Sequence, residues 1–313
     1  MTIMVGFPPG GGNDTWARLV SRHYGKFLPG NPTIIVENVP GAGGVIMANR
    51  LHESRPDGLT IGIHDRGISA VQLQGEEGVR YDVTKWTWLG SLTVEQYFYV
   101  VHQRVGVTPA NLDLLKTKEV KTANVSPGGF SHLMEIALKF GLDWKLTPIF
   151  GYQGNRETVL SIDRGETDGV AISWSSLLTQ KQDDLASKVM VPLVQMGGVS
   201  PDPLAAGVPT AAELLKDATP QAKQLLQFVE TPLNWSRSMS TPPNLEPRVA
   251  AGMRAAFEQM MADREFLADA AQLKFEIIPI PGERVQSMMG EFMKTSPETI
   301  KFVEAQVKKD APN

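Results

Sequence analysis

The chain has 313 residues, and at roughly 150 residues per domain this length predicts two domains. Its 30 basic and 34 acidic residues give a formal net charge of -4 with no basic stripe, so we expect no nucleic-acid partner. No apolar run approaches the roughly 18 residues of a membrane span, and we expect no insertion into a membrane. The absence of cysteine excludes disulfides, thiolate catalysis and cysteine-ligated metal centres.

One unit recurs along the chain: a short β-branched strand, a glycine-containing loop and an amphipathic helix. In chain order, strands or extended segments are predicted at residues 3–7, 33–37, 59–63, 97–102, 120–124, 146–150, 169–173, 189–196, 231–240 and 275–280. Helices are predicted at residues 14–27, 45–53, 132–140, 156–164, 210–215, 219–228, 247–261, 265–273 and 300–309. This alternation predicts an α/β fold with mainly parallel sheets.

Two extended segments, near residues 97–103 and 230–240, belong to no strand–loop–helix copy and indicate crossings between two lobes. We therefore expect a discontinuous first lobe, residues 1–97 plus 238–313, and an inserted second lobe, residues 98–237. Element boundaries predicted from sequence carry errors of several residues.

The glycine-containing loops all follow strands, so they are expected at the carboxyl ends of the sheets, where α/β folds bind ligands. Several of these loops open helices, whose free N–H groups and positive dipole ends attract anions. Glycine allows the main chain to approach such a ligand closely. Four charge-assisted hydrogen bonds of about 1.5–3 kcal/mol, with two helix ends, approach the roughly 8 kcal/mol of micromolar binding. The loops therefore predict a main-chain site for a carboxylate.

Motifs of other function classes are absent. The segment after Gly10 lacks the third glycine of a dinucleotide fingerprint, and neither a P-loop nor a G-x-S-x-G elbow occurs. The five histidines have no metal-ligand spacing, and we expect no metal and no cofactor. His64 with Asp65 is the one acid–base candidate for an enzyme. Asp14 and Asp168 are interpreted as acceptors that hold loops rigid.

The loops resemble those of the Bug-type, TctC-like periplasmic substrate-binding proteins of tripartite tricarboxylate transporters. The similar segments are FPPGGGND at residues 7–14, VENVPGAGG at 36–44, PDG at 56–58, SHL at 131–133, YQG at 152–154, GETD at 165–168 and VPTAAE at 208–213. They cover essentially the whole chain. The resemblance implies a type II-like, two-lobed periplasmic binding fold with its ligand in the cleft between the lobes.

The resemblance also implies which residues contact the ligand. Carried over position by position, they are Phe7, Gly11, Gly43, Ser131, Tyr152 and Gly154, with Asp14 and Asp168 in support. Residues of the same loops complete the predicted ligand-binding set: Gly12, Gly44, Asp65, Arg66, Phe130, Asn155 and Trp174. The charged pair Asp65 and Arg66 and the bulky Phe130 and Trp174 depart from the small residues usual in this family.

The leading hypothesis is a non-enzymatic periplasmic receptor that closes on a small di- or tricarboxylate or aromatic acid and delivers it to a membrane permease. Arg66 or Arg156 would hold a second polar end, and Phe130, Tyr152 and Trp174 would stack on the ligand or pack between the lobes. A monomer is expected. The chain opens on a strand without a leader, so either a leader has been removed or the protein is cytoplasmic. The alternatives are an enzyme acting on an anionic metabolite and a ligand-sensing module.

Overall fold

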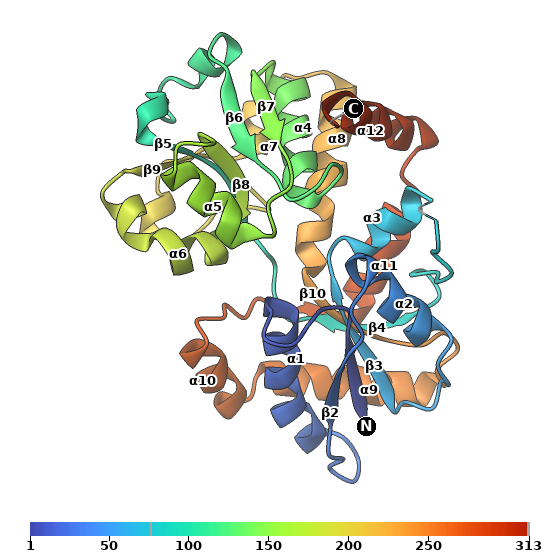
Figure 1. Ribbon diagram of the computed structural model, residues 1–313. Coiled ribbons are helices and arrows are strands. Elements are labelled where there is room, and N and C mark those ends of the chain that lie inside the picture. Colours follow the sequence, from blue (N-terminus) through green and yellow to red (C-terminus); the bar gives the residue numbers. More distant parts are fainter. Residues whose placement is uncertain (76, 312–313) are drawn as a thin grey trace. The chain divides into compact units, whose positions relative to one another are not determined.

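The computed structural model describes residues 1–75 and 77–311, which divide into two compact units (Figure 1). Unit 1 contains Met1–Val94 and Pro232–Thr295. Unit 2 contains Glu95–Thr231 and the chain from Ser296 onward. The predicted two-lobed α/β fold is therefore what the structure contains.

The predicted division placed all of residues 238–313 in the first lobe, and the structure differs at the carboxyl end. The last helix, α12 (Pro297–Asp310), packs against α4 (Phe130–Leu142) and α8 (Pro220–Glu230) and belongs to unit 2. Figure 1 shows α12, in dark red, beside these two helices. Nothing in the sequence near residue 296 distinguishes an amphipathic helix that packs on one unit from one that packs on the other.

Unit 1 is built on a six-stranded sheet with the order β11-β4-β10-β3-β1-β2. Its strands are β1 (Thr2–Val5), β2 (Ile35–Asn38), β3 (Thr60–Asp65), β4 (Thr87–Ser91), β10 (Arg237–Thr241) and β11 (Ile280–Pro281). β1 pairs in parallel with β2 and β3, whereas β10 is antiparallel to β3 and β4. The carboxyl ends of β1, β2 and β3 consequently share one edge.

The α-helices of unit 1 are α1 (Gly12–His23), α2 (Val45–His52), α3 (Ile68–Leu73), α9 (Pro247–Met261), α10 (Arg264–Gln272) and α11 (Gly282–Phe292). Two 3-10 turns, η1 (Tyr24–Phe27) and η2 (Ala42–Gly44), lie beside α1 and α2. The apolar stripe of α1 forms one core with β1, β3 and α9, including Leu19, Ile63 and Phe257. This core fixes the start of α1 against the sheet.

Unit 2 repeats the same arrangement with the strand order β7-β6-β8-β5-β9. Its strands are β5 (Tyr97–His102), β6 (Val120–Ala123), β7 (Leu146–Ile149), β8 (Gly169–Ser173) and β9 (Met190–Met196). β6 is parallel to β7 and β8, and β5 is antiparallel to β8 and β9. Both sheets therefore contain three adjacent parallel strands with an antiparallel strand beside them.

Around this second sheet lie α4, α5 (Asn155–Asp163), α6 (Trp174–Ala186), α7 (Ala211–Leu214), α8 and α12. The 3-10 turns are η3 (Gln103–Val105), η4 (Leu112–Lys116) and η5 (Pro203–Ala205). Phe98, Val159, Ile172 and Leu177 form a core between the sheet and the helices α5 and α6. None of the helices in the described residues combines the length and apolar character that a bilayer crossing requires.

Several predicted elements were wrong or absent. The extended segment predicted at 231–240 is a 3-10 turn, η6 (Thr231–Trp235), in its first half, and the strand predicted at 275–280 is reduced to Ile280–Pro281. β4, α3, α6 and α11 were not predicted from the sequence. The parallel strands occur near their predicted positions, and the helices after β1, β2, β6 and β7 follow them as predicted.

Candidate functional site

The helices that follow the six parallel strands begin without a side-chain cap. Their N-cap residues are Gly11, Gly44, Gly67, Gly129, Gly154 and Ser173, and none of them accepts a hydrogen bond from its helix through a side chain. In five other helices of the described chain, by contrast, the N-cap side chain does accept a hydrogen bond from a first-turn N–H. These N-cap residues are Thr210, Thr219, Glu246, Asp263 and Ser296. The remaining helix, α11, begins after Pro281. First-turn N–H groups at the carboxyl edges of both sheets are thus left to other acceptors.

In unit 1 the loops after β1 and β2 touch through their main chains. A Cβ on Gly6 would lie 2.7 Å from Cα of Gly44, and a Cβ on Gly44 would lie 3.8 Å from the Phe7 ring. Gly43 and Gly44 have φ of 60° and 100°, which glycine adopts without strain. The structure therefore brings the predicted Phe7 and Gly44 together on two touching loops, which also carry the exposed Gly11, Gly12 and Gly43.

Asp14 supports these loops from the third position of α1. Its carboxylate accepts the Gly10 N–H at 2.8 Å, the Asn38 Nδ2 at 2.9 Å, and a bidentate contact from Arg18 at 2.8 and 3.0 Å. Asn38 also donates to the Phe7 carbonyl at 3.0 Å. The bond from Arg18 and the main-chain N–H lower the pKa of Asp14 to about 2, although burial opposes the shift. The charge of Asp14 is thus paired within the loop.

At the end of β3, Asp65 lies between two arginines. Its Oδ2 is 3.9 Å from Arg66 Nη1 and 3.6 Å from Arg237 Nη1, and its Oδ1 accepts the Gly67 N–H at 3.0 Å. Burial raises the pKa of Asp65, but the two guanidinium groups outweigh this effect and hold it below its usual value. A Cβ on Gly12 would lie 3.9 Å from Arg237 Nη2, so Arg237 is a neighbour of the first loop.

Arg237 was missed by the sequence analysis. It comes from β10, the strand that returns to unit 1 after unit 2, and it pairs with Asp65 across the antiparallel ladder. The predicted crossing near 230–240 was the available signal, but the antiparallel register that sets Arg237 opposite Asp65 could not be deduced from it.

His64 does not form the acid–base pair considered for an enzyme. Its side chain is 1% exposed, stacks on Trp86 with ring centroids 4.6 Å apart, and has Nε2 2.8 Å from Ser240 Oγ. Burial lowers its pKa to about 3, so the ring is neutral near pH 7. Successive strand residues face opposite sides of a sheet, which separates His64 from Asp65.

In unit 2 the loop after β6 is closed by the helix that follows it. The Gly128 N–H donates to His132 Nδ1 at 3.0 Å, and Gly128 has a φ of 72°. Phe130 opens α4, with its ring centroid 5.0 Å from that of Tyr97, and Ser131 is half-buried beside it. The predicted Phe130 and Ser131 therefore lie at the uncapped start of α4.

The loops after β7 and β8 meet through a side-chain bond. Asn155 Nδ2 donates to Ser176 Oγ at 3.2 Å, and Gly154 precedes it with a φ of 132°. The half-buried Tyr152 packs against the core of unit 2, and its hydroxyl is 3.5 Å from Glu166 Oε2. These three predicted residues occupy one edge of the second sheet.

Trp174 is buried, in contrast to its predicted role as a stacking surface. Its side chain is 6% exposed, its ring centroid is 4.1 Å from that of Phe98, and its indole N–H donates to Asp202 Oδ2 at 3.0 Å. A ring held in this way packs the core of unit 2, while its main chain begins the uncapped helix α6.

Asp168 and Arg156 are not grouped with the other predicted residues. Asp168 immediately precedes β8, at the amino end of the parallel strands, where it accepts hydrogen bonds from Arg104 Nε at 3.2 Å and from the Lys121 N–H at 3.3 Å. It holds the edge of the sheet opposite to the glycine loops. Arg156 is exposed in the first turn of α5.

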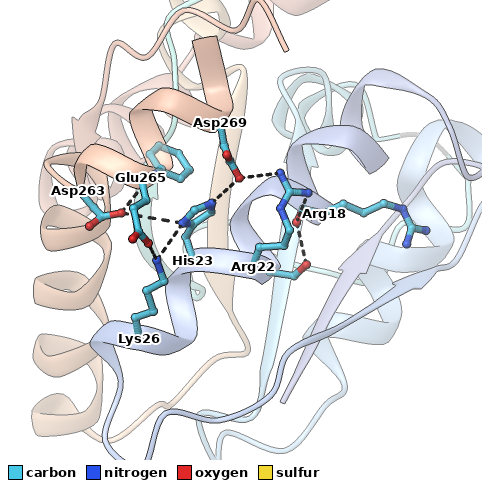
Figure 2. Close-up of polar contacts among 9 residues, drawn as sticks. Arg18, Arg22, His23, Lys26, Asp263, Glu265 and Asp269 are labelled. Atoms are coloured by element: carbon cyan, nitrogen blue, oxygen red, sulfur yellow. Dashed lines mark hydrogen bonds and ion pairs between the residues drawn. The ribbon is translucent and has the colours of Figure 1, made fainter. Parts of the chain in front are cut away.

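One further cluster of ligating side chains lies beside α1. His23 Nδ1 and the carboxylates of Asp263 and Glu265 lie within 4.8 Å of one another, but the Lys26 ammonium contacts Glu265 and lies 3.4 Å from that Nδ1 (Figure 2). The Asp269 carboxylate accepts a hydrogen bond from His23 Nε2 at 3.0 Å. The lysine supplies the positive charge in this cluster, which is an ion-pair network joining α1 and η1 to α10.

Comparison with known proteins identifies the class of fold. No model of a known protein family matches the chain. Over its whole length, however, the structure superposes on solved binding proteins. These are a TctC solute binding protein from Polaromonas (TM-score 0.75, 17% identity, 99% of this chain and 98% of that chain), the periplasmic binding protein BugD (0.67, 18%, 100% and 98%) and MatC from Rhodopseudomonas palustris with bound malate (0.63, 19%, 98% and 98%).

The fold is thus that of a two-lobed periplasmic binding protein. Within this class two of the three structures are a TctC solute binding protein and BugD, which confirms the resemblance predicted from the loops. In sequence, the chain is 27% identical over 187 residues to a UPF0065 protein of Cupriavidus necator. That match spans 57% of this chain and about half, 55%, of the relative.

Proposed function

We propose that this protein is a periplasmic solute receptor that binds a small organic carboxylate. The observation that carries the proposal is the set of uncapped helix starts at the carboxyl edges of both sheets. Helix starts whose N-cap residue supplies no side-chain acceptor are suited to a carboxylate, which accepts several hydrogen bonds and is attracted by the helix dipoles. The buried, neutral His64 gives no comparable support to an enzyme.

In unit 1 the main chain provides the carboxylate-binding groups. The proposed contacts are Phe7, Gly11, Gly12, Gly43 and Gly44, which stand on two touching loops. Asp14 supports these loops, and Asp65 pairs with Arg66 and with Arg237, whose Nη2 lies 3.9 Å from the Cβ position of Gly12. A ligand with a second acidic group would find its counter-charge at these arginines.

In unit 2 the proposed contacts combine aromatic and small residues. They are Phe130, Ser131, Tyr152, Gly154 and Asn155. The half-buried rings of Phe130 and Tyr152 suit the carbon skeleton of an organic acid rather than its charges.

The solved relatives support this ligand class and the transport role. One of the similar structures contains malate, a dicarboxylate, and others are named as TctC or Bug periplasmic binding proteins. By this likeness the receptor works in the periplasm and delivers its acid to the permease of a tripartite tricarboxylate transporter.

The proposal is tested by a thermal-shift screen with acetate, malate, citrate and benzoate, followed by calorimetry. An acid at 100 times its Kd is expected to add about 2.7 kcal/mol to the free energy of unfolding. If none of the acids raises the melting temperature, the proposed ligand class is wrong.

A variant in the first glycine loop and a control variant on α9 test whether the acid binds at this loop. Gly11 has a φ of -80°, and a Cβ there meets only the Pro8 carbonyl oxygen at 3.6 Å, so Gly11→Val is compatible with the fold. The new methyl groups are expected to exclude the carboxylate. Gly252→Ala, on α9 where nothing lies within 4 Å of the Cβ position, is the control. Unchanged affinity in Gly11→Val would contradict the proposed site.

A further inference from the structure

The end of α12 is bonded to the helix that follows the glycine loop of unit 2. The Asp310 carboxylate accepts two hydrogen bonds from Lys139 Nζ, at 2.7 and 2.8 Å, and lies 3.1 Å from His132 Nε2. Its side chain is only 15% exposed. Burial raises the pKa of Asp310, but the hydrogen bonds from His132 and Lys139 outweigh it and hold the pKa below its usual value. Asp310 is therefore an ionised acceptor at neutral pH.

The His132 ring lies between Asp310 and the loop and contacts both. Its ring is fully buried, with Phe150 packed edge-on at 4.9 Å, and its two nitrogens face different partners. The Gly128 N–H donates to Nδ1, so Nδ1 bears a lone pair and the ring proton is on Nε2, where it is donated to Asp310. The three groups form one directed chain of hydrogen bonds from the loop main chain to the carboxyl end of α12.

The loop in question carries two of the proposed ligand contacts. Gly128 lies between β6 and the start of α4, two residues before Phe130 and three before Ser131. Its φ of 72° is a conformation that glycine adopts without strain, so the hydrogen bond to His132 selects among conformations open to this residue. Val307 of α12 also lies 3.6 Å from the Cβ position of Gly128, so α12 contacts this loop directly as well.

We propose that Asp310 is a positioning residue for ligand binding, which orients His132 and thereby holds the Gly128 loop in the conformation that presents Phe130 and Ser131. This inference rests on the proposed function for its consequence in binding, but the loop geometry can be measured without a ligand. Asp310 on α12 would in this way determine the shape of a ligand loop that lies about 180 residues earlier in the sequence.

The first measurement is made on the wild-type protein. Long-range proton–nitrogen NMR spectra at pH 7.5 are expected to show His132 as the neutral ring protonated on Nε2. A ring protonated on Nδ1 would overturn the proposal, whatever any variant does.

Three variants then separate positioning from simple anchoring of α12. In Asp310→Ala, hydrogen exchange of the Gly128 amide and the Kd for malate are both expected to rise about 10-fold, as for one lost hydrogen bond to a charged group. Asp310→Asn keeps an acceptor for Nε2 and is expected to restore both values to within about 3-fold of wild type. Lys139→Met, the control, removes the other partner of Asp310 and is expected to leave Gly128 exchange unchanged.

The outcomes distinguish this inference from the proposed function. Unchanged Gly128 exchange in Asp310→Ala, or an equal increase in Lys139→Met, would refute the positioning role even if the wild type binds malate. A response of Gly128 together with no binding of malate by the wild type would leave the loop geometry established and would contradict its role in binding this acid.

Discussion

In each unit, a glycine N–H of the loop donates a hydrogen bond to a side chain four residues later, but the accepting group differs between the units. In unit 1 the Gly10 N–H donates to Asp14 at 2.8 Å, and in unit 2 the Gly128 N–H donates to His132 at 3.0 Å. Each acceptor stands four residues after its glycine, at the third position of a helix that follows the middle parallel strand. The same local geometry thus uses a carboxylate in one unit and a neutral imidazole in the other.

The two acceptors also differ in how far their support lies along the chain. Asp14 is held by Arg18, one helical turn away, whereas His132 is held by Asp310, 178 residues away. Asp14 is therefore supported from within the first 38 residues, by Arg18 and Asn38, whereas the loop of unit 2 depends on the packing of α12. Equivalent positions in two similar sheets need not share the same means of support.

The largest effect is expected from removing the acceptor of unit 1. Asp14→Ala leaves the Gly10 N–H, Arg18 and Asn38 without their common acceptor, and should lower the free energy of unfolding by about 3 kcal/mol in urea titrations. Asp113→Ala, which removes an exposed carboxylate, is the control and should not move the midpoint. A loss no larger than that of the control would show that this loop does not depend on Asp14.

The pH dependence of the same variant sharpens the result. Because the pKa of Asp14 is lowered from 3.8 to about 2 in the folded protein, its stabilisation is present above pH 4 and is lost as the pH falls through 2. The difference in stability between wild type and Asp14→Ala should therefore shrink on acidification.

A second prediction concerns a buried carboxyl group of unit 2 whose pKa is raised rather than lowered. Glu135 on α4 is fully buried, and although it accepts from Thr122 and Asn124, burial raises its pKa to about 8. Its contribution is therefore largest below pH 4.5 and falls as the pH rises through 8. Glu135→Gln should raise the free energy of unfolding by about 2 kcal/mol near pH 8, and by little at pH 5, in paired denaturant titrations. Equal effects at both pH values would contradict the shift.

A smaller effect is expected at Trp174. Trp174→Phe removes the hydrogen bond to Asp202 and should lower the free energy of unfolding by about 1 kcal/mol. Because the ring is buried in the core, calorimetry should find the affinity for the bound acid changed less than about 2-fold. A much larger loss of affinity would restore the stacking role predicted from the sequence.

The smallest effect is expected at Arg156, which is exposed on α5. Arg156→Ala should change neither stability nor the preference for malate over acetate, since the counter-charges proposed for a second acid group are in unit 1. Selective loss of malate binding, measured by calorimetry with both acids, would move that role to unit 2.

The sequence predicted the elements whose signals are local. Glycine loops between β-branched strands and amphipathic helices gave the parallel halves of both sheets, and they placed Gly11, Gly43 and Gly154 at the correct edges. The hydrogen bonds that Asp14 accepts could be anticipated, because its partners Gly10 and Arg18 are within four residues.

The features that escaped prediction depend on contacts between distant segments. Arg237 reaches the first loop only through the antiparallel pairing of β10 with β3, and Asp310 reaches His132 only through the packing of α12. Trp174 was expected to face a ligand because it follows a strand, but the rotation of its side chain toward Phe98 depends on the core. Such choices are made by packing, which one-dimensional patterns do not record.

The chain crosses between the units three times, after Val94, Thr231 and Thr295. During synthesis, α4 and its loop leave the ribosome long before the segment that carries Asp310. Nascent unit 2 therefore lacks the Asp310 partner of His132 until the second segment of unit 1 has been synthesised.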